Sequence, residues 1–139
     1  MVTITTGRGL DVSRIAKERC SFLRRHLGDI EVIALQIGAL INPTSTKSED
    51  EIYFAYFFTQ EESQERHKVE NSTGQTVEKI VLVDYVLRDK KLPDLVTVAP
   101  DLVLAHHVIE HTPNPIEWFR EIRSTCEAGA SFFTFVPLR

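Results

Sequence analysis

Residues 101–137 read DLVLAHHVIEHTPNPIEWFREIRSTCEAGASFFTFVP, and this stretch predicts the fold. An apolar run at 102–105 ends in a polar cluster, and a second apolar run covers 131–136. Between them Asn114 can cap a helix, Pro115 suits its first position, and Gly129 suits its end. The order strand, helix, strand is a crossover between parallel strands, so the stretch predicts a parallel sheet.

The polar cluster comprises His106, His107, Glu110 and His111, and it follows the first of these strands. Ligands of open parallel sheets bind outside the carboxyl ends of the strands, so the cluster is a candidate site. Three of its members have the H-x-x-E-H spacing of inverted zinc proteases, which requires a helix that Pro113 would break. A different metal site and a tight turn held by backbone hydrogen bonds are the alternatives.

Composition indicates one globular domain over residues 1–139, because 42% hydrophobic and 26% charged residues are ordinary values. A net charge of −4 and a pI near 5.7 favour neither nucleic acid nor an anionic membrane as partner. The start of the chain has no signal-peptide pattern, and no apolar run reaches the ~20 residues that span a bilayer. We therefore expect a cytoplasmic protein, with Cys20 and Cys126 as buried thiols.

The chain divides into an N-terminal arm and helix, residues 1–28, and a core, residues 29–139. Residues 1–10 predict a loose arm or a short edge strand, followed by a helix that Asp11 caps and Gly28 ends. Together with a polar helix from 60 to about 68, the core predicts strands at 31–37, 52–58, 78–84, 101–105 and 131–136. This alternation predicts a three-layer α/β/α sandwich whose strand ends surround one cleft, and a homodimer that covers an unpaired sheet edge.

The run DLVLAHHVIEHTPNPIEWFREI, with EAGASFFTFVP after it, resembles the second half of class I S-adenosylmethionine-dependent methyltransferases. ALQIGALINPT is similar to the first motif of that family, an apolar strand followed by a glycine-bearing loop. The resemblance covers residues 31–137. It implies a Rossmann-like, doubly wound, mostly parallel sheet that is truncated after the fifth strand, because the family's sheet usually continues with two more.

The resemblance also implies which residues would bind S-adenosylmethionine. Gly38 and Ala39 would lie against the methionine part, and Gln36 stands where the first motif has an acid. Tyr56 stands near the place of the family's ribose-binding acid. Asp84 and Tyr85 match the position that contacts the adenine.

Two histidines would face the transferred methyl group of a methyltransferase with an unidentified acceptor. His106 and His107 follow the fourth predicted strand, where the family's reactive sulfonium lies. For a hydroxyl or amine acceptor, His107 would be the base, since a histidine ordinarily titrates near neutral pH. The resemblance implies no resident metal.

Two other functions are open to this sequence. Gln36, Leu40 and Tyr56 replace an acid, a glycine and a second acid of the family pattern, which favours an inactive methyltransferase-like domain that serves as a binding or assembly module. A dinucleotide-dependent oxidoreductase requires G-x-G-x-x-G after the first strand, and residues 38–43 read GALINP instead.

Overall fold

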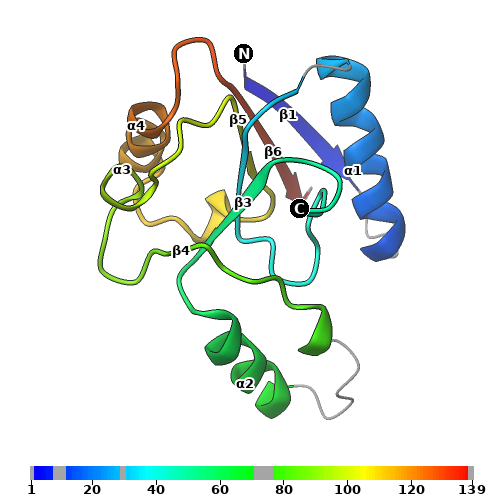
Figure 1. The fold of residues 1–139 in the computed structure, drawn as a ribbon, viewed down its shortest axis with the longest axis vertical. Coiled ribbons are helices and arrows are strands. Elements are labelled where there is room, and N and C mark those ends of the chain that lie inside the picture. Colours follow the sequence, from blue (N-terminus) through cyan, green and yellow to red (C-terminus); the bar gives the residue numbers. More distant parts are fainter. Residues whose placement is uncertain (1, 8–11, 29–30, 71–76, 138–139) are drawn as a thin grey trace.

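The computed structural model describes residues 2–7, 12–28, 31–70 and 77–137, and strands alternate with helices along them (Figure 1). The predicted cap Asp11 lies outside the described residues. The elements are β1 (Val2–Gly7), α1 (Val12–Leu27), β2 (Ala34–Ile37), β3 (Ile52–Tyr56), α2 (Gln60–Glu70), η1 (Val77–Lys79), β4 (Tyr85–Val86), α3 (Leu92–Leu95), β5 (Leu102–Ala105), η2 (Ile109–His111), α4 (Pro115–Thr125) and β6 (Ser131–Pro137).

All strands belong to one sheet in the order β1-β6-β5-β2-β3-β4, and every neighbouring pair is parallel. From β2 the chain builds outward through β3 and β4, whereas β5 and β6 lie on the other side of β2. The order therefore reverses between β2 and β5, whose last residues Ile37 and Ala105 are direct partners. A crevice for a ligand is expected at the carboxyl ends of these two strands.

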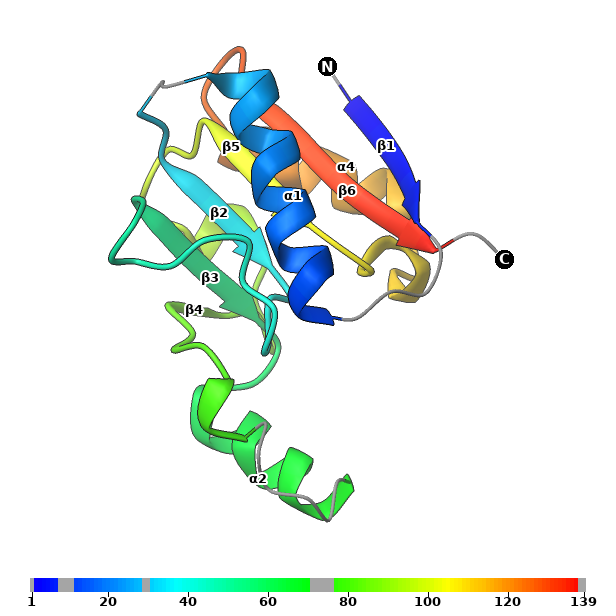
Figure 2. The same cartoon turned by 90° about the vertical axis from the view of Figure 1, so that its right-hand side faces the viewer.

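Helices cover both faces of the sheet, which confirms the predicted three layers (Figures 1 and 2). On one face Leu23 and its neighbours on α1 pack against β2, β3, β5 and β6. On the other face Ile122, Trp118 and Phe119 of α4 and Leu92 of α3 pack against the same strands. All four residues of β2 and of β5 are buried, as expected for strands that are covered on both sides.

For the N-terminal segment the sequence left open a loose arm or a short edge strand, and β1 is such an edge strand. β1 pairs in parallel with β6 from Val2↔Phe132 to Gly7↔Pro137, and it makes the sheet six-stranded. The Rossmann-like, doubly wound architecture is confirmed, and the pairing is parallel throughout.

The predicted strand at 78–84 is wrong. Residues 77–79 form the single turn η1, and pairing with β3 begins only at Ala55↔Tyr85. Apolar character misled the prediction because Ile80 is buried for another reason: the chain here covers the loop after β2, and the N–H of Val81 donates to the carbonyl of Leu40 over 2.9 Å.

Two connections distinguish this sheet. Residues 38–51, between β2 and β3, contain no helix, so α1 from earlier in the chain covers that face. The polar helix α2 stands away from the sheet (Figure 2).

In the described parts of the chain, no helix combines the length and the apolar character that crossing a bilayer requires.

Candidate functional site

Gly38 follows the last residue of β2, and two features of the structure favour glycine at this position: its backbone conformation and a close neighbouring side chain. Its φ of +73° lies in the left-handed region, and its N–H donates to the carbonyl of Ala55 over 3.0 Å. A Cβ at this position would lie 2.9 Å from Cγ2 of Val108. The room left by the missing side chain is therefore used by Val108, from the segment that follows β5.

A cleft of about 440 Å³ opens on the α4 side of this point, and we call it the α4 cleft. Its lining comes from the last residue of β2, from the segments after β3, β4 and β5, and from α4. The lining combines apolar and charged side chains. The apolar residues include Ile37, Phe57, Leu87, Val108 and Trp118, and the charged residues include Arg88, Asp89, Lys90, Lys91, Glu117 and Glu121.

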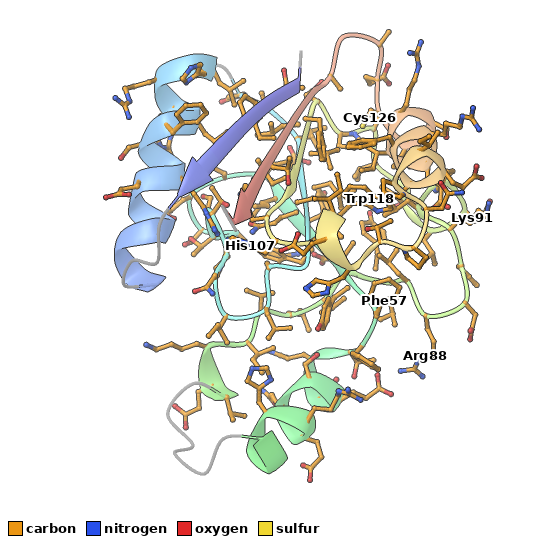
Figure 3. All side chains as sticks on the ribbon, turned by 180° about the vertical axis from the view of Figure 1, so that it is seen from behind. Phe57, Arg88, Lys91, His107, Trp118 and Cys126 are labelled. Atoms are coloured by element: carbon orange, nitrogen blue, oxygen red, sulfur yellow. The ribbon has the colours of Figure 1, made fainter. Side chains whose placement is uncertain are left out.

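A second cavity, of about 280 Å³, lies at the same sheet edge on the α1 side, and we call it the α1 cavity. It brings together Gln36, Gly38, Ala39, His106 and His107, five of the eight residues that the sequence selected. The remaining lining residues are Arg19 of α1 and Leu40, Ile41 and Asn42. In Figure 3, His107 lies toward α1, whereas Phe57, Trp118 and Lys91 lie on the side of α4.

Gln36 is 1% exposed and holds the loop after β2 with both ends of its amide. Its Nε2 donates to the carbonyl of Asn42 over 3.3 Å, and its Oε1 accepts from the N–H of Thr44 over 2.8 Å. A carboxylate could accept the second bond but could not donate the first. Gln36 thus shapes the wall of the α1 cavity through the loop that it fixes.

His106 is 6% exposed, and its Nε2 lies 3.1 Å from Oγ1 of Thr44. Burial is the largest cause that lowers the pKa of His106 to about 3, and the nearby charges of Arg19 and His107 contribute in the same direction. The imidazole is therefore neutral near pH 7. Together with Gln36, it ties the loop at Thr44 to the ends of β2 and β5.

His107 follows with a φ of +56°, which turns its side chain toward α1. The guanidinium of Arg19 donates to Nε2 of His107 over 2.9 Å. Since a guanidinium can only donate, Nε2 is the acceptor and the ring proton of the neutral form lies on Nδ1. Nδ1 faces Oε1 of Glu110 at 3.6 Å.

The other three predicted residues lie apart from the α1 cavity and do not line the α4 cleft either. Tyr56 ends β3 and packs edge-on against Phe57 and Phe58. Asp84 precedes β4, where its carboxylate accepts the N–H of Phe54 over 2.8 Å and pairs with Lys47. Tyr85, in β4 itself, packs against a neighbouring ring in β3, and its hydroxyl lies 3.2 Å from Oγ1 of a threonine at position 97.

β4 lies later in the chain than the predicted strand at 78–84, which explains why Asp84 and Tyr85 do not line the α4 cleft. Because β4 is Tyr85–Val86, the first acid after its carboxyl end is Asp89, and Asp89 lines the α4 cleft. The run VDYVL at 83–87, followed by the charged residues 88–91, was the available signal for this strand end. Sequence reasoning also missed Arg19, which reaches the α1 cavity from α1.

The alternative metal site is not assembled. Over residues 12–28, 31–70 and 77–137, no group of three or more His, Cys, Asp or Glu side chains is placed to share a metal ion. Glu110 and His111 belong to the single turn η2, in which the N–H of His111 donates to the carbonyl of Val108. This geometry corresponds to the tight-turn alternative.

No family model matches the sequence, and no curated protein matches it. Among solved structures, the chain is similar to the crystal structure of the glycopeptide N-methyltransferase MtfA complexed with sinefungin, with a TM-score of 0.53 and 14% sequence identity. The superposition covers 84% of this chain and 51% of that chain, so this chain spans about half the length of MtfA. A likeness at this identity shows the fold alone: the chain has a Rossmann-like methyltransferase fold.

Proposed function

We propose that this chain binds S-adenosylmethionine across Gly38 and transfers its methyl group to an unidentified acceptor. The observation that carries the proposal is the pair of hollows at one sheet edge, the α4 cleft and the α1 cavity, on either side of the ends of β2 and β5. The similarity to an N-methyltransferase that was crystallised with sinefungin, an analogue of S-adenosylmethionine, supports it.

The α4 cleft suits the adenosine part of the cofactor. Its volume of about 440 Å³ lies in the range of roughly 300–1,000 Å³ that is usual for small-molecule sites. Trp118, Leu87 and Val108 offer apolar surface to a flat base, and the carboxylate of Asp89 can accept a hydrogen bond from the exocyclic amine of adenine. Asp89 takes over the role that the resemblance gave to Asp84 and Tyr85.

The ribose would lie nearest the end of β3, where the described chain has no acid. Phe57 lines the cleft there, whereas Tyr56, the last residue of β3, packs edge-on against Phe57 and does not line the cleft. A carboxylate would accept two charge-assisted hydrogen bonds from the ribose diol, each worth about 1.5–3 kcal/mol. We therefore expect an affinity at least about tenfold weaker than that of a site with this acid.

The methionine part would extend past Gly38 and Ala39 into the α1 cavity, as the resemblance implies. Gln36 and His106 would act indirectly there, since their side chains hold the loop at Asn42 and Thr44 that forms part of the wall. The cavity volume of about 280 Å³ is ample for a four-carbon amino-acid tail.

When bound, S-adenosylmethionine supplies an electrophilic methyl group on a positively charged sulfur. The residues around it would align an acceptor atom with that methyl group and exclude water, which is the main requirement of a direct displacement. His107 remains our candidate for taking a proton from an amine or hydroxyl acceptor. Its Nε2 lone pair is engaged by Arg19, so this role requires that hydrogen bond to open.

A binding or assembly module without catalysis is the second candidate function. Two observations favour it: Val108 lies directly against Gly38, and the amide of Gln36 is committed to the loop rather than to open space. Under this alternative, the fold would persist and the hollows would not bind the cofactor.

Binding of S-adenosylhomocysteine and sinefungin, measured by thermal shift and by calorimetry, separates the two functions. A ligand at 100 times its Kd stabilises a protein by about 2.7 kcal/mol, which corresponds to roughly 8–10 °C in a domain of this size. NADH serves as a control for nonspecific binding. If neither S-adenosylhomocysteine nor sinefungin raises the melting temperature at millimolar concentration, the function is that of a binding or assembly module.

A further inference from the structure

Large apolar side chains are exposed at the carboxyl edge of the sheet. Among the described residues the most exposed are Phe57 after β3, Leu82 before β4 and Ile116 in the first turn of α4, at 53%, 59% and 66%. Phe57 lines the α4 cleft, whereas Ile116 lines neither hollow. A single exposed leucine is ordinary on a protein surface, so the surroundings of Leu82 decide whether it has a role.

The segment that carries Leu82 is held in place from two sides. Ile80 is 3% exposed, and its carbonyl accepts a hydrogen bond from Nε2 of Gln60 over 2.7 Å. The N–H of Val81 donates to the carbonyl of Leu40, which lines the α1 cavity. Leu82 is therefore exposed on a fixed backbone beside that cavity, and a ligand that contacts it need not order the segment first.

Leu40 has a backbone conformation that favours glycine. Its φ of +50° lies in the left-handed region, where the Cβ of an ordinary residue comes too close to a carbonyl oxygen. Among the described residues other than glycine, only Leu40 and His107 have such a φ, and both line the α1 cavity. Strained residues cluster at functional sites, so a leucine at this position points to a use for its side chain.

Ile41 extends the apolar surface that Leu40 begins. Both residues line the α1 cavity, and both are half-buried. Leu82 lies in the segment that is hydrogen-bonded to Leu40. We call these three residues the apolar wall. His107, the candidate base of the proposed function, lines the same cavity as Leu40 and Ile41.

We propose that the apolar wall binds the methyl acceptor, and that this acceptor is a small molecule with an apolar body, an aromatic ring or an alkyl chain, that carries one hydroxyl or amino group. The role as acceptor rests on the proposed function. The apolar body would pack against the wall while its polar group faces His107. A sugar or another polyhydroxylated acceptor would lose hydrogen bonds to water there, because the side chains of the wall cannot replace them.

The transfer would proceed in one displacement. The lone pair of the acceptor's oxygen or nitrogen forms a bond to the methyl carbon, and the carbon–sulfur bond breaks with its electron pair left on sulfur. The proton of the hydroxyl or amino group passes to the imidazole of His107. The products are the methylated acceptor and S-adenosylhomocysteine.

A series of 4-alkylphenols tests the proposal on the intact chain. Phenol, 4-ethylphenol and 4-butylphenol present the same hydroxyl with an apolar body of increasing length. We expect the Kd to fall about twofold for each added methylene, because a half-exposed wall removes only part of each methylene from water. In NMR titrations the shifts should centre on the amides of residues 40, 41 and 82. An affinity that does not depend on chain length would overturn the proposal.

Substitutions in the apolar wall test its residues. Leu82→Gln and Leu40→Gly should each weaken binding of 4-butylphenol about three- to tenfold and leave binding of phenol within about twofold. Glycine relieves the strained φ of residue 40, so the melting temperature of Leu40→Gly should stay within about 3 °C of the wild-type value. Ile116→Gln is the matched control, because it removes an equally exposed apolar side chain that lines neither hollow.

The control defines two contrary results. Equal weakening of 4-butylphenol binding by Ile116→Gln would overturn the assignment to the apolar wall. Unchanged binding in folded Leu40→Gly and Leu82→Gln variants would overturn it as well.

Other occupants of this surface give different readouts. Trp118, the single tryptophan of the chain, lines the α4 cleft, so quenching of its fluorescence by 4-butylphenol would place the probe in the wrong hollow and overturn the proposal. Competition between 4-butylphenol and S-adenosylhomocysteine would also overturn it, because acceptor and cofactor have to bind together. A dimer, measured by light scattering, that Leu82→Gln dissociates would assign the wall to a second copy of the chain instead.

Failure of the proposed function would look different from failure of this inference. If S-adenosylhomocysteine does not bind but 4-butylphenol binding depends on Leu40 and Leu82, methyl transfer is overturned and the wall is the ligand site of a binding module. If S-adenosylhomocysteine binds and the alkylphenols do not, the acceptor class is overturned and the proposed function stands.

Discussion

Val108 lies so close to the backbone of Gly38 that a Cβ at residue 38 would meet Cγ2 of Val108 at 2.9 Å. This contact joins the segment after β5 to the end of β2, and its two residues line different hollows: Val108 lines the α4 cleft and Gly38 lines the α1 cavity. The packing at this one point therefore bears on both stability and ligand access.

Gly38→Ala should lower the free energy of unfolding by about 2–3 kcal/mol, because the left-handed φ and the clash with Val108 both oppose a side chain. Val108→Ala removes the clash but not the backbone strain. The double variant should therefore be about 1 kcal/mol more stable than the sum of the two single effects predicts. Denaturant titrations of the four proteins measure this coupling, and strict additivity would show that the contact carries no strain.

His106 should make the fold sensitive to acid. Its pKa is lowered to about 3 in the folded chain against about 6.5 in the unfolded chain, so the unfolded chain binds more protons between these values. The stabilisation is complete above about pH 6.5 and decreases as the pH falls, by at most about 1.4 kcal/mol for each unit down to about pH 3. Chemical unfolding between pH 7.5 and 4.5 measures the slope.

His106→Gln should flatten that pH dependence, since an amide does not titrate. His26→Gln is the matched control, because His26 is exposed on α1 and its removal leaves the buried imidazole in place. An unchanged slope in the His106 variant would assign the acid sensitivity to other groups.

Gln36→Met should cost about 2–3 kcal/mol of stability although it conserves side-chain volume. The substitution leaves the N–H of the buried Thr44 and the carbonyl of Asn42 without the partner that Gln36 supplies. Amide hydrogen exchange at Thr44 should accelerate in parallel. Gln64→Met on α2, where no hydrogen bond of the side chain is lost, should change stability by less than about 0.5 kcal/mol.

Asp89→Ala should weaken binding of S-adenosylhomocysteine roughly 10–100-fold, because it removes the charged acceptor at the carboxyl end of β4. Asp84→Asn is the informative comparison, since the carboxylate of Asp84 accepts the N–H of Phe54 and does not line the cleft. It should lower the melting temperature and leave the affinity within about threefold. The reverse result, with Asp84 controlling affinity, would restore the adenine contact that the sequence resemblance implied.

Local patterns were sufficient for most of the fold. The buried strands β2 and β5 are continuous apolar runs, and α4 begins where Asn114 accepts the N–H of Glu117, as its sequence predicts. The strand predicted at 78–84 was the failure, because residues 80–83 are apolar but do not pair with β3: Ile80 is buried, Leu82 is 59% exposed, and the N–H of Val81 donates to the carbonyl of Leu40. Apolar character alone therefore does not specify a strand or its partner.

The candidate site could be predicted only in part, again because local sequence patterns do not specify which distant residues pack together. Gln36, Gly38 and His106 follow directly from the ends of β2 and β5, so knowing the strands was enough to place them together. Arg19 could not be found in this way, because its position in the cavity depends on how α1 crosses the sheet. That packing involves contacts between residues far apart in the chain, such as Arg19 and His107, which local periodicity does not encode.

The pairing of β1 with β6 has a consequence for biosynthesis. The first described strand finds its hydrogen-bonding partner only in the last, Ser131–Pro137, so on the ribosome it emerges long before that partner exists. At ordinary elongation speeds of about 5–20 residues per second the delay is on the order of ten seconds. During that interval, β2, β3 and β5 can associate, whereas the pairing of β1 has to wait until β6 has been synthesised.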